Sequence, residues 1–89
     1  MEEAVEMDAK MKELIDGLNE DLANEYASVI MYTNYAAVVT GMYRQVLKPF
    51  FEEETTDELG HALYLAEKIK TLGGEPTITP AEVKQTDNV

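Results

Sequence analysis

Apolar side chains recur at steps of three and four residues along two long stretches of this 89-residue chain. The first stretch runs from about Asp8 to Thr40 and the second from about Tyr43 to Leu72. The repeating positions are Leu14, Leu18, Leu22, Glu25, Val29, Tyr32, Ala36 and Val39, then Leu47, Phe51, Glu54, Glu58, His61, Leu65, Ile69 and Leu72. This spacing is typical of helices that bury one face. It predicts an all-α fold, a long antiparallel helical hairpin that turns near Gly41.

Residues that start and stop helices set the expected boundaries of this hairpin. Asp8 is the expected N-cap of the first helix, which makes residues 1–7 an N-terminal extension. Gly73 and Gly74 are expected to end the second helix, with a proline close behind them. The hairpin is therefore expected to span residues 8–74.

Proline affects both the second helix and the tail. Pro49 lacks a backbone N–H and fits best in the first turn of a helix. Two alternatives stay open: the helix begins near Lys48, or it begins near Tyr43 and bends at Pro49.

Residues 75–89 contain two prolines and show no periodicity, so this tail is expected to be extended or disordered.

Charge and composition exclude several classes of protein. The formal net charge is −11, from seven basic and eighteen acidic residues, which argues against partners such as nucleic acid or an anionic membrane surface. No apolar run approaches the ~18 residues of a membrane span, and no signal peptide is evident. There is no cysteine, hence no thiolate metal site. A cytoplasmic location is the expectation.

Ionisable side chains interrupt the two apolar stripes at their middle. Glu25 lies on the first stripe, and Glu58 and His61 lie on the second. Burying a carboxylate without a partner costs several kcal/mol. Neither stripe offers a lysine or arginine near its middle. Such carboxylates need a cation, a proton or a hydrogen-bond network, and a bound metal cation is the partner that this arrangement predicts.

The positions of these residues along the chain support a shared site. Glu25 precedes Gly41 by 16 residues and Glu58 follows Tyr43 by 15. At ~1.5 Å per residue, both carboxylates lie about 22–24 Å from the turn. One hairpin provides two carboxylates and one imidazole, and a twofold pair provides four carboxylates for two divalent cations. We therefore expect a homodimer, or a higher even number of chains, forming a four-helix bundle around iron, manganese or zinc.

A competing interpretation needs no metal. Glu-x-x-His pairs arise by chance on many helices, and the acidic residues would be solvated if the buried stripe were slightly rotated. Such a stripe could consist of Phe50, Leu59, Ala62 and Ala66.

Three further residues are candidates for roles around the metals. Tyr32 could hydrogen-bond a ligand or act as an oxidisable group, although core packing is the alternative. Glu54 could assist metal entry or support a ligand, although a solvated acidic turn is the alternative. Asp57 could accept a hydrogen bond from the imidazole, although a surface role is equally consistent with the pattern.

The same residues resemble the ferritin-like superfamily, and its bacterioferritin-like branch in particular. The resemblance covers the first helix pair only, from about Leu14 to Thr77. It rests on four segments of the chain: LNEDLANE at 18–25, Tyr32, DELGHA at 57–62 and LGGEP at 72–76. It implies a ferritin-like four-helix bundle with a di-iron carboxylate site.

The resemblance also assigns a role to each ligand. It implies that Glu25 is a terminal carboxylate ligand, Glu58 a bridging carboxylate and His61 an imidazole ligand. Leu59 stands where bacterioferritins carry a haem-binding methionine, so no haem is expected. The implied activity is ferroxidase, that is iron(II) oxidation by dioxygen or peroxide, serving iron handling or oxidant detoxification.

Two other functions fit the residues. The first is a non-catalytic four-helix assembly that binds zinc or manganese. The second is a helical interaction module whose metal site is never completed.

Overall fold

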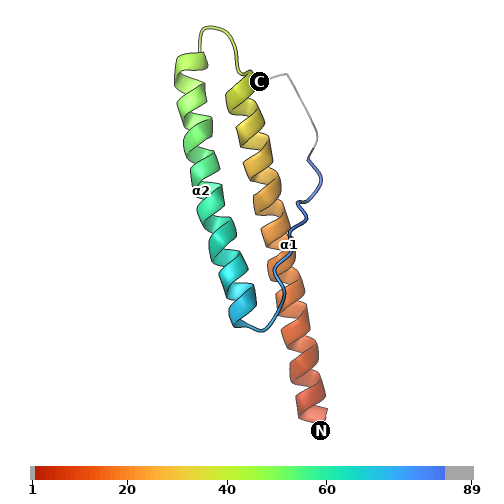
Figure 1. Ribbon diagram of the computed structural model, residues 1–89. Coiled ribbons are helices and arrows are strands. Elements are labelled where there is room, and N and C mark those ends of the chain that lie inside the picture. Colours follow the sequence, from red (N-terminus) through yellow and green to blue (C-terminus); the bar gives the residue numbers. More distant parts are fainter. Residues whose placement is uncertain (1, 84–89) are drawn as a thin grey trace.

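The computed structural model describes residues 2–83, with side chains from residue 8 onwards, and confirms the all-α hairpin (Figure 1). Helix α1 spans Glu2–Val38 and helix α2 spans Arg44–Thr71. The expected helix start at Asp8 is wrong, because α1 already begins at Glu2. The residues before Asp8 are mostly glutamate, alanine and methionine, which favour helix, and acidic residues are stabilised in a first turn. Residues 2–7 therefore continue α1.

The connection between the helices is short and depends on a glycine. Gly41 has a φ of +89°, a conformation that side chains with a Cβ rarely adopt. The guanidinium of Arg44 donates to the carbonyl of Val39 across this connection. The carbonyl of Tyr43 accepts hydrogen bonds from two residues of the first turn of α2, at 3.0 and 2.9 Å. This network turns the chain back along α1.

Pro49 lies inside α2, in its second turn. The alternative in which the helix begins near Tyr43 is therefore confirmed, and a start near Lys48 is wrong. A proline at this position removes the hydrogen bond that residue 49 would donate to the carbonyl of Gln45, and its ring crowds that carbonyl.

Two glycines terminate α2 as expected. Gly73 has a φ of +90°. The N–H of Gly73 bonds the carbonyl of Lys70 and the N–H of Gly74 bonds that of Ile69, each at 3.0 Å. This pair of bonds is a Schellman motif, which satisfies carbonyls that the last helical turn leaves free.

The segment 75–83, here called the strap, follows this motif and runs back along α1 (Figure 1). It contains no helix or strand, in agreement with the expected extended tail. Asn19 both donates a hydrogen bond to the strap and accepts one from it, and the N–H of Ala81 donates to the carbonyl of Ala23, which attaches the strap to α1. Residues 84–89 of the expected tail lie outside the described residues.

The buried core lies between the helices and is small. Leu22, Ala62 and Ile69 are almost completely buried at its centre. Around them lie five partly buried residues: Ile15, Leu18, Tyr26, Leu65 and Ala66. Leu14, expected on the buried stripe, is 49% exposed, and Ile15 takes its place because the stripe is rotated by one residue there. No helix within the described residues is long and apolar enough to span a membrane.

Gly74 allows the chain to pass close to the core. An added Cβ would lie 2.6 Å from a methyl group of Ile15 and 3.1 Å from one of Ile69. We expect Gly74→Ala to lower the free energy of unfolding by about 1–3 kcal/mol, the usual cost of overpacking. Gly17→Ala is the matched control, because nothing lies within 4 Å of its added Cβ. In a helix interior that change should stabilise by roughly 0.5–1 kcal/mol. Urea unfolding would measure both effects, and equal effects would contradict this account of Gly74.

Candidate metal centre

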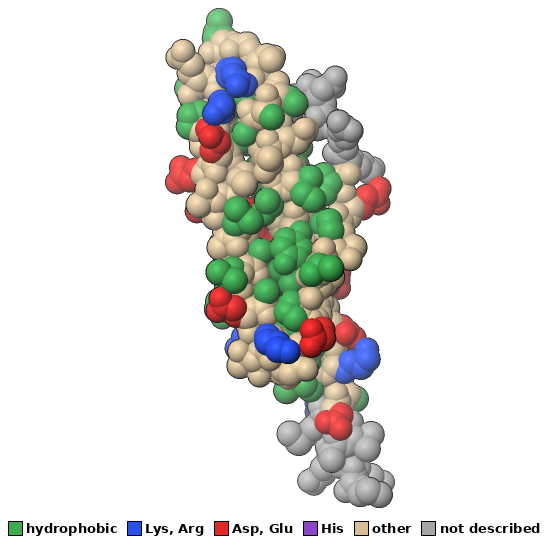
Figure 2. Space-filling view, viewed as in Figure 1, with side chains coloured by type: hydrophobic (Ala, Val, Ile, Leu, Met, Phe, Trp, Pro, Cys, Tyr) green, Lys and Arg blue, Asp and Glu red, His purple; other side chains and the backbone are tan. Residues whose placement is uncertain are grey.

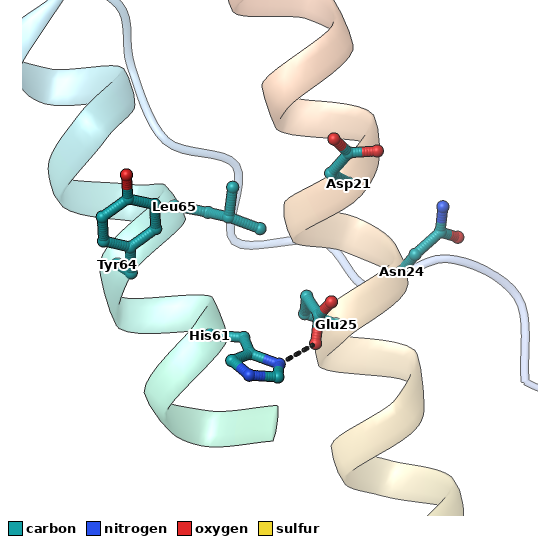
Figure 3. A pocket seen from close by; sticks show the side chains of 6 residues that line it. All are labelled: Asp21, Asn24, Glu25, His61, Tyr64 and Leu65. Carbon is teal, nitrogen blue, oxygen red and sulfur yellow. Dashed lines mark ion pairs between the residues drawn. The ribbon is translucent and has the colours of Figure 1, made fainter. Parts of the chain in front are cut away.

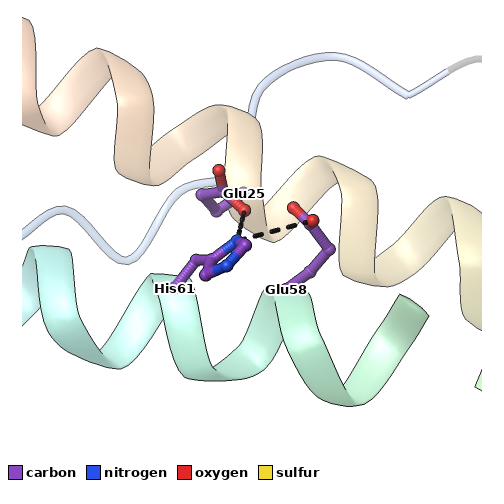
Figure 4. A group of neighbouring side chains, drawn as sticks. All are labelled: Glu25, Glu58 and His61. Atoms are coloured by element: carbon purple, nitrogen blue, oxygen red, sulfur yellow. Dashed lines mark ion pairs between the residues drawn. The ribbon is translucent and has the colours of Figure 1, made fainter. Parts of the chain in front are cut away.

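The three predicted ligands lie together in the structure. Glu25 comes from α1, and Glu58 and His61 come from neighbouring positions one turn apart on α2 (Figure 4). Each offers a ligand atom, and these atoms lie within 4.8 Å of one another. The antiparallel hairpin therefore brings a carboxylate of one helix to the level of the Glu-x-x-His pair of the other.

The imidazole is oriented toward both carboxylates. His61 Nδ1 lies 3.6 Å from Glu25 Oε2 and 3.5 Å from Glu58 Oε1. The side chains of Glu25 and Glu58 are only 25% and 18% exposed, whereas that of His61 is 61% exposed. The two carboxylates thus lie inside the helix pair and the imidazole lies at its edge. This cluster faces an open side of the hairpin.

One oxygen of the cluster has no hydrogen-bond partner. Glu25 Oε2 is buried and accepts no hydrogen bond from any described residue. The ion pairs of Lys12, Lys48 and Lys70 join other carboxylates. An unsatisfied buried carboxylate oxygen is costly, and carboxylate and imidazole groups are ligands suited to iron, manganese or zinc. The residues present therefore fit a divalent cation.

The two carboxyl groups also affect each other. The pKa of Glu58 is raised above its ordinary value of 4.5, chiefly because its protonated form hydrogen-bonds Glu25. Burial and the charge of Glu25 raise this pKa further, Asp57 adds a small contribution, and His61 opposes the rise. The metal-free protein therefore favours a proton at the position where a cation would bind.

This raised pKa predicts how stability depends on pH. The folded, metal-free protein holds the Glu58 proton more tightly than the unfolded chain does. The free energy of unfolding should therefore decrease as the pH rises from 4.5 through the folded-state pKa, and the loss should be complete above it. Glu58→Gln should lack this component. Unfolding of both proteins in chelator across this pH range would measure the difference, and parallel profiles would contradict the prediction.

The other candidates from the sequence lie outside this group of three. Tyr32 stacks on Phe51, with ring centroids 6.2 Å apart, and also contacts Tyr35. Its position agrees with the core-packing alternative. Glu54 is partly buried and Asp57 is exposed. Their predicted roles in metal entry and imidazole orientation stay predictions.

Sequence reasoning missed the residues that surround the cluster. A groove of about 370 Å³ contains Glu25 and His61 and is further lined by Asp21, Asn24, Tyr64 and Leu65 (Figure 3). Asp21 precedes Glu25 by four residues and Tyr64 follows His61 by three, so helical spacing could have identified both. The groove extends the site along both helices.

Comparisons with known proteins agree with this geometry. A family model described as the ferritin-like domain matches residues 15–89. A crystal structure of ferritin-like, diiron-carboxylate proteins from Bacillus anthracis str. Ames is similar, with 70% sequence identity and a TM-score of 0.86. The match covers 89% of this chain and 57% of that one, so this chain spans little more than half of that relative. No curated protein gave a significant match.

The evidence for the family is thus of two independent kinds. The family match covers most of the chain, including α2 and all of α1 from residue 15 onwards. The structural match adds the same helical arrangement at high sequence identity. This chain belongs to the ferritin-like domain family.

Proposed function

We propose that this chain provides half of a di-iron carboxylate centre and that a second copy provides the other half. The observation that supports this most directly is the buried Glu25 Oε2, which accepts no hydrogen bond and lies beside Glu58 and His61. The similarity to a diiron-carboxylate protein supports iron as the metal. Two copies would together contribute four carboxylates and two imidazoles, whose charge matches two divalent cations.

Each residue has a distinct part in this proposal. Glu58 is the least exposed of the three side chains and would be the bridging carboxylate. Glu25 approaches from the other helix as a terminal ligand, and His61 presents Nδ1. Bound iron(II) with open coordination positions would supply electrons to dioxygen or peroxide. The proposed role is therefore ferroxidase activity, in iron handling or oxidant detoxification.

Exposed apolar side chains support a partner for the hairpin. Phe50, Leu59, Leu63 and Tyr64 of α2 are each about half exposed or more. Figure 2 shows further apolar side chains on another face, over the middle of the surface where the strap crosses α1. Contiguous apolar surface is unusual on a monomer of this size, and a small two-helix core rarely suffices for stability. Assembly into a four-helix bundle would cover part of this surface.

The decisive experiment combines native mass with metal content. Sedimentation at micromolar concentration should show an even number of chains, and dialysis against iron(II) without oxygen should give two metals per pair. Admission of air should then produce a ligand-to-metal absorption band. A folded monomer without metal would contradict the proposal. Stoichiometric zinc or manganese binding with no response to iron(II) and air would favour a non-catalytic metal-binding assembly instead.

A further inference from the structure

The strap is attached to α1 mainly by one side chain. The amide nitrogen of Asn19 donates to the carbonyl of Glu75 at 3.1 Å, and its amide oxygen accepts the N–H of Thr77 at 2.7 Å. The N–H of Ala81 adds a bond of 2.9 Å to the carbonyl of Ala23. Asn19 thus satisfies two backbone groups of a segment that follows it by more than fifty residues.

The strap and the metal centre lie on different flanks of α1. One side of α1 contacts or faces the strap through residues at helical spacing, namely Asn19, Ala23, Tyr26 and Ile30. Glu25 follows Ala23 by two residues, which places it about 200° further round the helix. A rotation of α1 that pulls Asn19 and Ala23 from the strap would therefore also move Glu25.

Packing against α2 opposes such a rotation through one fully buried side chain of α1 and several partly buried ones. Only Leu22 of α1 is fully buried in the cluster with Ala62 and Ile69. Across this contact the carboxylates of Glu25 and Glu58 repel each other whenever both are charged and no cation is present. The repulsion favours a rotation that separates them. The hydrogen bonds to the strap on the opposite flank of α1 add resistance to it.

We propose that Asn19 is a positioning residue for the metal centre. Through the strap, it holds α1 in the rotation that keeps Glu25 within ligand distance of Glu58 and His61. The role in metal binding rests on the proposed function, whereas the effect on α1 does not depend on a metal. The two can therefore be tested separately.

The first test measures zinc(II) binding by equilibrium dialysis. Asn19→Ala should weaken binding by about tenfold, the lower end of what loss of a ligand-supporting contact costs. Helix content and native mass should not change. Asn19→Asp keeps the acceptor for the Thr77 N–H and should recover part of the affinity. Ile78→Ala is the control, because that strap side chain is 90% exposed and forms no anchoring hydrogen bond. Equal zinc affinity in wild type and Asn19→Ala would overturn the role in metal binding.

The second test measures hydrogen exchange of the α1 amides near Glu25 in metal-free protein, at a pH at which both carboxylates are charged. Asn19→Ala should speed exchange there severalfold in the wild-type background. In a Glu58→Gln background the same change should have a clearly smaller effect, because the repulsion is gone. Such coupling between residues that do not touch distinguishes positioning from simple stabilisation. Equal effects in the two backgrounds would overturn the proposal. Failure of wild type to bind any metal would contradict only the proposed function.

Discussion

Glu58→Ala is expected to abolish binding of the metal pair. Glu58 is the least exposed of the three proposed ligands and lies beside both His61 and Glu25. A bridging carboxylate serves both ions, so its removal should weaken both sites. Loss of a group that merely supports a ligand costs 10–100-fold in affinity, so loss of this ligand should cost about 100-fold or more. Equilibrium dialysis with iron(II) under anaerobic conditions would measure the change.

The control for this variant is another glutamate on α2. Glu67 is exposed, and in the structure only its backbone carbonyl accepts a hydrogen bond, from Thr71. Glu67→Ala should therefore bind metal like the wild type, which separates a ligand effect from a general change in charge. Circular dichroism should show the same helix content in both variants. Binding of two metals per pair by Glu58→Ala would mean that Glu58 is not the bridging ligand.

Replacement of Glu25 is expected to stabilise the metal-free protein. Its buried oxygen lacks a hydrogen-bond partner, and its negative charge lies close to the Glu58 carboxyl group. Glu25→Gln removes the charge and adds a donor that can bond Glu58, while Glu25→Leu removes the buried polar group altogether. A gain of about 1 kcal/mol would raise the melting temperature by roughly 4–8 °C for a domain of this size. Ligand clusters commonly reduce stability in this way for the sake of function.

The same variants should respond less to metal. A ligand that binds only the folded protein stabilises it by about 2.7 kcal/mol at a hundred times its dissociation constant. Weaker binding in the Glu25 variants should reduce this gain. Thermal melts in chelator and in metal would measure both effects, with Glu20→Gln as the control at an exposed glutamate of α1. An unchanged melting temperature in chelator would mean that Glu25 is solvated, and the centre would lose one of its ligands.

The local sequence was sufficient to predict the two helices and the glycines that follow them. The steps of three and four residues predicted α1 and α2 because the helical period depends only on the backbone. Gly73 was predictable as a stop because a positive φ favours glycine. The helical period did not predict that α1 begins at Glu2 or that Pro49 lies inside α2. Both depend on small differences in helix propensity that packing between α1 and α2 can override.

The three proposed ligands were also predictable from the sequence, but the contacts that surround them were not. Glu25, Glu58 and His61 were identifiable because carboxylates on an apolar stripe need a partner, and hairpin geometry placed them at one level. The direction of His61 Nδ1 and the unpartnered oxygen of Glu25 depend on side-chain packing. The spacing of residues in the sequence predicts neither the direction of the imidazole nor the missing hydrogen bond. The aromatic contacts of Tyr32 likewise follow from how the helices meet.

The strap was determined by the tertiary structure alone. Its sequence shows no periodicity, and it forms no hydrogen-bond ladder of its own that a local pattern could indicate. It is ordered along α1 because Asn19 bonds its backbone and Gly74 lets it pass close to Ile15. These contacts join residues more than fifty positions apart, and such pairings depend on the completed hairpin. The amino-acid sequence by itself therefore determined the helices and the three proposed ligands, whereas the packing of α1 between α2 and the strap decided how those side chains are held.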